Sequence, residues 1–218
     1  IKLINESEEN KKNIAKDFFV FRLPFGTGND GSDGRNLEES LLRLNFPAHI
    51  ELQKAVKVSC QGINSQKNTW FAFNIASIGI DAFITHMTNK MKSKLPGDFY
   101  KLWVDLACVF YTWFYKKVPA FMELFKENNS IATYDNKIEF ALLGSSGHRT
   151  YGSNHLILPT DENCCITESV SLIKKLIIKH HFNDGTHYGK PYSVFYDADK
   201  IKIAYDENLN KITFEKST

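Results

Sequence analysis

A glycine-containing loop between an apolar segment and a helix start is the feature that most constrains this fold. Residues 18–21 (Phe-Phe-Val-Phe) are aromatic or β-branched and are bounded by charges, which is the pattern of a buried strand. Asn36, followed by Glu39 and then by three leucines, predicts a helix that begins with a capping box. Residues 23–30 therefore form a strand-to-helix loop, and the first part of the chain is expected to be the edge of an α/β domain.

This loop has the residues of an anion-binding site. Gly26 and Gly28 let backbone N–H groups approach an anion closely, and the nearby helix N-terminus adds positive potential. A nucleotide phosphate is the expected ligand, although an ordinary glycine turn explains the spacing equally well. The pattern GxxxxGK[ST] is absent, so the loop is not of the Walker type.

Three stretches resemble the diacylglycerol kinase catalytic-domain family, which includes bacterial lipid kinases, sphingosine kinases and ceramide kinases. Residues 24–30 (Pro-Phe-Gly-Thr-Gly-Asn-Asp) resemble its P-x-G-T-x-N-D signature. Residues 73–82 resemble its F-x-N-x-A-S-x-G-x-D-A segment, and residues 143–152 resemble its G-N-G-x-x-x-G-G loop, with Leu-Pro at 158–159 where the family has I-A-P. Three matches in the same order are far more specific than one, and the resemblance covers most of residues 18–205.

The resemblance implies an α+β fold with two parts. Residues 1–56 would be the C-terminal part of an α/β nucleotide-binding domain, and residues 57–218 a mainly antiparallel β-sandwich domain for the lipid substrate, with inserted helices. Local patterns agree with this division, because residues 56–60 and 69–73 predict a hairpin and residues 137–143 another strand. Further strands are predicted at 192–196, 200–205 and 212–214.

Two helices are predicted in the second part. Residues 169–181 form one, with an inward face made of Leu172, Ile173, Leu176 and Ile177. Residues 100–117 form another, whose uninterrupted apolar run is too short for a membrane span. It is a core helix, the wall of an acyl-chain pocket, or a helix that rests on a bilayer surface.

The reaction implied by the resemblance is transfer of the γ-phosphoryl group of ATP–Mg²⁺ to a lipid hydroxyl, on diacylglycerol or a sphingoid base. Gly26, Thr27, Gly28 and Asn29 match the family's nucleotide loop. Thr27 would hydrogen-bond a phosphate, and the glycines would offer backbone N–H groups. Asp30 would stabilise the loop or a metal-bound water.

Three acidic residues match other functional positions of the family. Asp81 matches a position near the lipid head group, although a carboxylate that caps a turn explains it equally well. Asp161 lies near the element that binds a structural Mg²⁺, but its glycine is missing, and two adjacent acids are also typical of a solvated turn. Glu215 stands where the family has the Asp of a catalytic D-G-E, and neither the Gly nor the second Glu follows it.

These departures leave two functions open. A G-G-D-G-T loop, which helps hold the nucleotide in the family, is absent, and the chain begins with Ile1 rather than Met. We expect either a piece of an ATP-dependent lipid kinase, active as the full-length enzyme, or a non-catalytic lipid- or nucleotide-binding relative. A nicotinamide-dinucleotide kinase is a third alternative, which the G-T-G-N-D loop disfavours.

The composition limits which binding partners and which cellular location are expected for this protein. The net charge of +2 over 218 residues excludes a general nucleic-acid binder. A lipid substrate and a peripheral membrane contact are expected, and the basic residues within 174–181 either complement a helix dipole or face anionic lipid. The four cysteines lack metal-binding spacing, so they predict reduced thiols and a cytoplasmic location.

Overall fold

The computed structural model describes residues 21–25, 34, 36–45, 54–61, 68–92, 106, 111, 119–151, 155–204 and 211–217. The chain divides into two compact units, Ile1–Leu52 and Gln53–Thr218. The assignment of the first part to a nucleotide-binding domain and of the second to a lipid-substrate domain stays a prediction. The predicted strand at residues 18–21 and the helix at 100–117 lie almost wholly outside the described residues.

The first unit contains the predicted helix start. Helix α2 spans Leu37–Asn45, and the side-chain Oδ1 of Asn36 accepts a hydrogen bond from the backbone N–H of Glu39 at 2.8 Å. The N-cap is therefore confirmed, because this oxygen satisfies a backbone donor that has no partner within the helix. The Glu39 carboxylate pairs with Arg43 one turn later at 2.7 Å.

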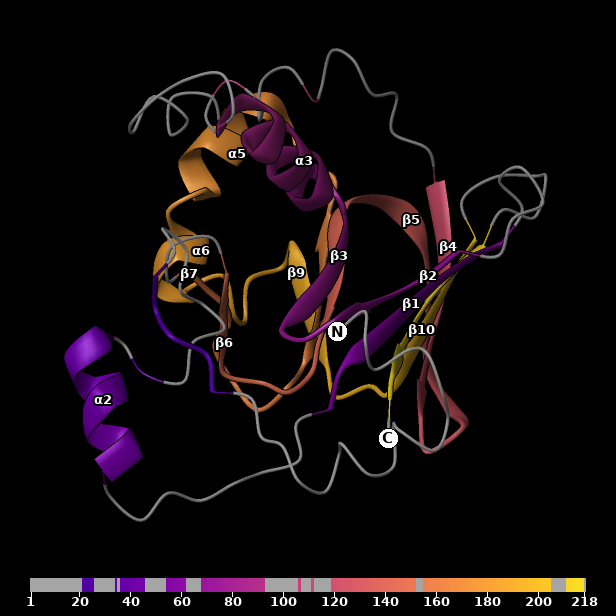
Figure 1. Cartoon of the computed structure of the whole chain (residues 1–218). Helices are drawn as coiled ribbons and strands as arrows, with labels where there is room; N and C mark the ends of the chain where they lie inside the picture. Colours follow the sequence, from indigo (N-terminus) through magenta and orange to yellow (C-terminus); the bar gives the residue numbers. More distant parts are fainter. Residues whose placement is uncertain are drawn as a thin grey trace. The chain divides into compact units, whose positions relative to one another are not determined.

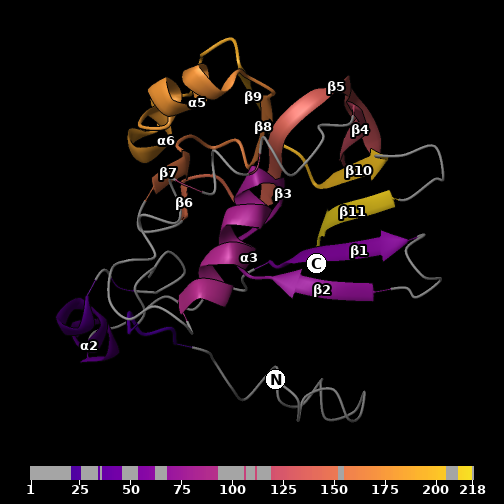
Figure 2. The same ribbon diagram turned by 90° about the horizontal axis from the view of Figure 1, so that it is seen from above.

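The second unit is built on antiparallel strands that form two faces of a sandwich (Figures 1 and 2). The first face, sheet A, contains in spatial order β2 (Asn68–Ala72), β1 (Val56–Gln61), β11 (Lys211–Lys216), β10 (Lys200–Ala204), β4 (Pro119–Lys126) and the first half of β5 (Asn129–Gly144). The other face, sheet B, contains β3 (Ile75–Gly79), the second half of β5, β8 (Cys164–Glu168) and β9 (Ser193–Tyr196). The expected α+β fold with its mainly antiparallel sheets and the predicted hairpin of β1 and β2 are confirmed.

Strand β5 joins the two sheets. Its first half pairs with β4, and its second half pairs with β3 on one side and β8 on the other. The register with β8 shifts between Ile138 and Phe140, so Glu139 occupies a bulge where the strand changes sheets. The predicted strand at 137–143 is therefore the second half of a longer strand that belongs to both faces.

Alternating side chains of sheet B face two separate cores. Ala141 and Leu143 of β5 lie in the central core between the sheets, together with Met122, Ile201 and Phe214 of sheet A. The residues between them, Phe140 and Leu142, lie in a second core on the other side of sheet B, with Ile80, Ile157, Leu158 and Cys165. Because successive strand residues point to opposite faces, this sheet is buried on both sides.

The remaining elements cover the outer side of sheet B. Helix α3 (Ile80–Lys92) follows β3 directly, and the hairpin of β6 (Arg149–Tyr151) and β7 (His155–Leu158) lies against the second core. Helices α5 (Leu172–Ile178) and α6 (His181–Asp184) complete this side (Figure 1). Within the described residues, no helix is long and apolar enough to cross a bilayer.

The predicted inward face of the helix at 169–181 is wrong. Ile173, Leu176 and Ile177 are 73%, 50% and 59% exposed, whereas Lys175 and Ile178 are buried. The cause is a non-local ion pair, in which the ammonium group of Lys175 meets the carboxylate of Glu139 in the β5 bulge. Both side chains are buried, and because a buried charge is stable only beside its partner, this pair fixes the rotation of the helix.

Candidate functional site

The junction of β3 and α3 places Asp81, and it requires a glycine. Gly79 has φ of +91°, a conformation that side chains with a Cβ rarely adopt. A Cβ on Gly79 would also lie 2.9 Å from the Cα of Phe140 and closer still to the carbonyl oxygen of Glu139. The close approach of β3 to β5 therefore depends on this glycine, and α3 begins at the next residue.

Asp81 lies in the first turn of α3 with an unpaired acceptor atom. Its Oδ2 is buried and has no hydrogen-bond partner among the described residues. Burial raises the pKa of this carboxyl from 3.8 to about 6, and a hydrogen bond with the Ser77 side chain opposes the shift. A carboxylate with a buried free oxygen can accept a hydrogen bond from a ligand hydroxyl, and an acid in the first helical turn also complements the dipole. Both predicted roles of Asp81 fit this position.

The second and third signature stretches meet in space. Ile75 of β3 is paired with Gly144 of β5. The side-chain amide of Asn74 donates to the carbonyl oxygen of Thr150 at 2.9 Å, and the backbone N–H of Ser145 donates to the carbonyl oxygen of Asn74 at 2.9 Å. The Oδ1 of Asn74 and the hydroxyl of Ser145 are buried without a partner among the described residues, so this corner holds unsatisfied polar atoms.

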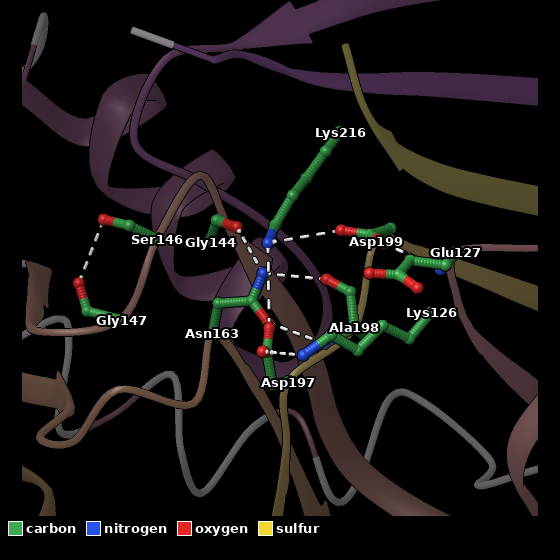
Figure 3. Close-up of polar contacts among 10 residues, drawn as sticks. All are labelled: Lys126, Glu127, Gly144, Ser146, Gly147, Asn163, Asp197, Ala198, Asp199 and Lys216. Atoms are coloured by element: carbon green, nitrogen blue, oxygen red, sulfur yellow. Dashed lines mark hydrogen bonds and ion pairs between the residues drawn. The ribbon is translucent and has the colours of Figure 1, made fainter. Parts of the chain in front are cut away.

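The loop that begins at Gly144 is held by a buried asparagine that sequence reasoning missed (Figure 3). The Asn163 carboxamide donates to the carbonyl oxygens of Gly144 at 3.3 Å and Ala198 at 2.8 Å, and it accepts from the Ala198 N–H at 2.8 Å. The backbone N–H of Gly144 donates to the carbonyl oxygen of Asn163 at 2.7 Å. No local pattern marks Asn163, because its partners lie far away in the sequence. The first residues of this loop, Gly144 and Ser145, are buried.

Asp161, the predicted metal ligand, lies in a turn beside this loop. Its side chain is fully exposed, and its Oδ1 lies 2.9 Å from Nε2 of His148. Glu162 pairs with the Thr160 hydroxyl, and this hydrogen bond lowers its pKa. Among the residues that the structure describes, no three His, Cys, Asp or Glu side chains gather as a metal site. The predicted role of Asp161 in binding a structural magnesium ion stays a prediction.

Glu215, the predicted catalytic acid, lies on the outer face of sheet A. Its neighbour Phe214 fills the central core, so the Glu215 side chain points away from that core. The strand register places Lys57 on one side of Glu215 and Lys200 on the other, and the Lys200 ammonium forms an ion pair with its carboxylate. Its catalytic role stays a prediction, since an ion-paired carboxylate at the surface is also typical of a sheet face.

Glu215 borders a polar cleft of about 220 Å³. Asp199 lies in the same cleft, where its Oδ2 accepts a hydrogen bond from the Glu127 N–H at 3.0 Å, which lowers its pKa. The Lys216 ammonium lies 3.6 Å from Oδ1 of Asp199, and Lys126 pairs with Asp197 (Figure 3). The charges of this cleft are therefore largely neutralised by one another.

The predicted nucleotide loop, Gly26, Thr27, Gly28, Asn29 and Asp30, lies outside the described residues. Its binding role stays a prediction.

The chain resembles known proteins in fold alone. No family model matches the sequence, and no curated protein does. Two structures of a "putative diacylglycerol kinase" from Bacillus anthracis str. Sterne align with TM-scores of 0.49 and 0.47 at 14% and 15% identity. A third structure, of a diacylglycerol kinase from the same organism, aligns with a TM-score of 0.49 at 16% identity. Each alignment covers 88% of this chain, which spans 64% of the length of the other protein.

The junction of β3 and α3, where Asp81 lies, is the candidate site of the second unit. The unsatisfied oxygens of Asn74 and Ser145 lie at the opposite end of β3, because Ile75 is paired with Gly144 and Gly79 with Phe140. The Asp81 carboxylate can accept a hydrogen bond or a proton.

Proposed function

We propose that this chain is part of an ATP-dependent lipid kinase that transfers the γ-phosphoryl group to a lipid hydroxyl, on diacylglycerol or a sphingoid base. Asp81 carries the proposal, because it lies in the second signature stretch and keeps a buried carboxylate oxygen without a partner among the described residues. The order of the three stretches supports the same function, and so does the contact between the second and the third.

The nucleotide would bind to the first signature stretch. Backbone N–H groups of Gly26 and Gly28 donate to the polyphosphate, and the Thr27 hydroxyl and the Asn29 amide add side-chain hydrogen bonds. Asp30 stabilises the loop. No step of this proposal depends on a metal ion held by the described residues, so none is assigned to Asp161.

Asp81 would orient the lipid hydroxyl. With a pKa of about 6, this carboxyl is about nine-tenths ionised at about pH 7. Its free oxygen then accepts a hydrogen bond from the hydroxyl, whose oxygen attacks the γ-phosphorus while the bond between that phosphorus and the leaving ADP oxygen breaks. The hydroxyl proton passes to the Asp81 carboxylate that accepts this hydrogen bond, because Glu215 lies on the outer face of sheet A, across the sandwich from α3.

A non-catalytic relative is the second candidate, and one observation favours it. The Glu215 carboxylate is engaged by Lys200, and neither the Gly nor the second Glu of the family's acidic motif follows it. Such a protein would bind the nucleotide or the lipid without transferring a phosphoryl group.

Labelled ATP separates the two candidates. The full-length protein is incubated with γ-labelled ATP and mixed micelles of diacylglycerol or sphingosine, and ATP binding is measured in parallel by calorimetry. We expect labelled lipid with the wild type, its loss in D81N, and its retention in D135N, which changes an exposed aspartate on the outer face of sheet A. ATP binding without labelled lipid would establish the non-catalytic candidate. Unchanged ATP affinity in both T27A and N29A would contradict the loop assignment.

A further inference from the structure

Helix α5 carries an exposed apolar stripe. Ile173, Leu176 and Ile177, which we call the α5 stripe, are 73%, 50% and 59% exposed. They lie three and four residues apart, so they share one side of the helix. Contiguous exposed aliphatic side chains on one helix face are uncommon unless the face binds another surface.

The opposite side of α5 holds the stripe in this orientation. Lys175 is buried in its ion pair with Glu139 and lies 5.6 Å from the centre of the Tyr111 ring, and Ile178 is buried one turn later. The Ser171 hydroxyl caps the helix by accepting from the Lys174 N–H. A rotation of α5 about its axis that buried the stripe would separate the buried ion pair of Lys175 and Glu139, which is strongly unfavourable. Among the residues that the structure describes, none buries the stripe.

Positive charges flank the stripe on both sides. Successive residues of an α-helix are rotated by about 100°, which places Lys174 and Lys179 on opposite edges of the stripe. His180 comes two turns after Ile173, so it lies on the same side. Both lysines are exposed, and residues 169–183 contain no acidic residue. Figures 1 and 2 show α5 on the side of sheet B away from sheet A.

We propose that the α5 stripe docks the second unit on the surface of an anionic lipid bilayer. An apolar stripe edged by lysines matches the two layers of such a surface, with aliphatic side chains among the acyl chains and ammonium groups at the phosphate level. The uniform sign of the charges provides electrostatic complementarity to anionic lipid, which an apolar protein partner does not require. This inference does not depend on phosphoryl transfer, since the α5 stripe does not include Asp81.

Vesicle co-sedimentation without nucleotide tests the apolar part. The full chain is sedimented with vesicles of phosphatidylcholine alone or with about 30 mol% phosphatidylserine, which gives a negative surface potential. We expect wild-type protein to partition onto the anionic vesicles and I173N/I177N to lose at least about tenfold in partition coefficient. I131N, which changes an exposed isoleucine of β5, is the matched control and should bind like the wild type. Circular dichroism confirms that each variant is folded.

The lysines are tested in the same assay. K174Q/K179Q should lower binding to anionic vesicles by about fivefold per lysine and leave binding to pure phosphatidylcholine unchanged. K202Q, on the outer face of sheet A, is the control, and added salt should weaken wild-type binding.

Three outcomes would overturn the proposal: wild-type protein that stays in the supernatant with both vesicles, an I173N/I177N variant that binds as tightly as the wild type, or a stripe-dependent dimer in sedimentation velocity. The last would assign the stripe to a second copy of the chain. Failure of lipid phosphorylation with intact vesicle binding would reject the kinase and leave this proposal standing.

Discussion

Replacing Asp81 with asparagine should change how the stability of the protein depends on pH. The folded state binds the Asp81 proton more tightly than the unfolded state, because burial raises the pKa from 3.8 to about 6. The protonated Asp81 carboxyl therefore adds its whole contribution to the unfolding free energy below pH 3.8. This contribution is lost as the pH rises through about 6. Above that value, the folded protein holds a buried, incompletely paired carboxylate.

The size of the effect follows from the shift. A change from 3.8 to about 6 corresponds to about 3 kcal/mol of unfolding free energy between the protonated and the ionised limits. D81N keeps the shape of the side chain and carries no charge, so it lacks this dependence. Relative to the wild type, D81N should gain about 2 kcal/mol between about pH 4 and about pH 8, because an unfolded carboxyl with a pKa of 3.8 is already more than half ionised at about pH 4.

Urea unfolding measures this difference directly. Wild type, D81N and D135N are unfolded at both pH values and followed by tryptophan fluorescence, and the change between pH values is compared across the proteins. D135N should follow the wild type, because Asp135 is exposed. Since each variant serves as its own reference, a lost hydrogen bond in D81N does not enter the comparison. If wild type and D81N change equally with pH, the pKa of the Asp81 carboxyl is not raised by burial and the argument for a reactive group at this junction fails.

Three further predictions concern the supports of the site. G79A should destabilise the protein by at least about 3 kcal/mol, because φ is positive at this position and the added Cβ would overlap β5. G189A, with φ of +73° and open space around it, should cost only about 1 kcal/mol. Thermal unfolding compares the two variants. K175M should cost about 3–5 kcal/mol by removing the cationic partner of the buried Glu139 carboxylate, and K175M/E139L should recover most of this loss in urea titrations. His187 is buried between two carbonyl oxygens, and burial lowers its pKa from 6.5. The unfolding free energy of the wild type should therefore fall as the pH drops below 6.5, and H187N should lack this fall. If the unfolding free energies of H187N and the wild type depend on pH in the same way, this prediction is wrong.

Short-range sequence patterns determined much of the secondary structure. The alternation in residues 56–60 and 69–73 predicted the β1–β2 hairpin, and Asn36 predicted the start of α2, because each depends on neighbours within a few residues. The α+β class also followed from such patterns and from the resemblance of the three signature stretches. The likeness of Asp81 to a family position directed attention to it, but the sequence said nothing of its raised pKa.

Tertiary structure decided the orientation of α5 and the shape of the site. A helix was predicted at 169–181 and α5 occupies only Leu172–Ile178 of that range. Its buried side is the one that carries Lys175, since the partner Glu139 lies in a bulge of a distant strand. Asn163 likewise acts through Gly144 and Ala198, which no local window contains. The spacing of apolar residues predicts a helix, but it does not determine which side of the helix is buried. That side depends on groups that only the folded chain brings together, because a buried charge or amide is stable only beside its partner.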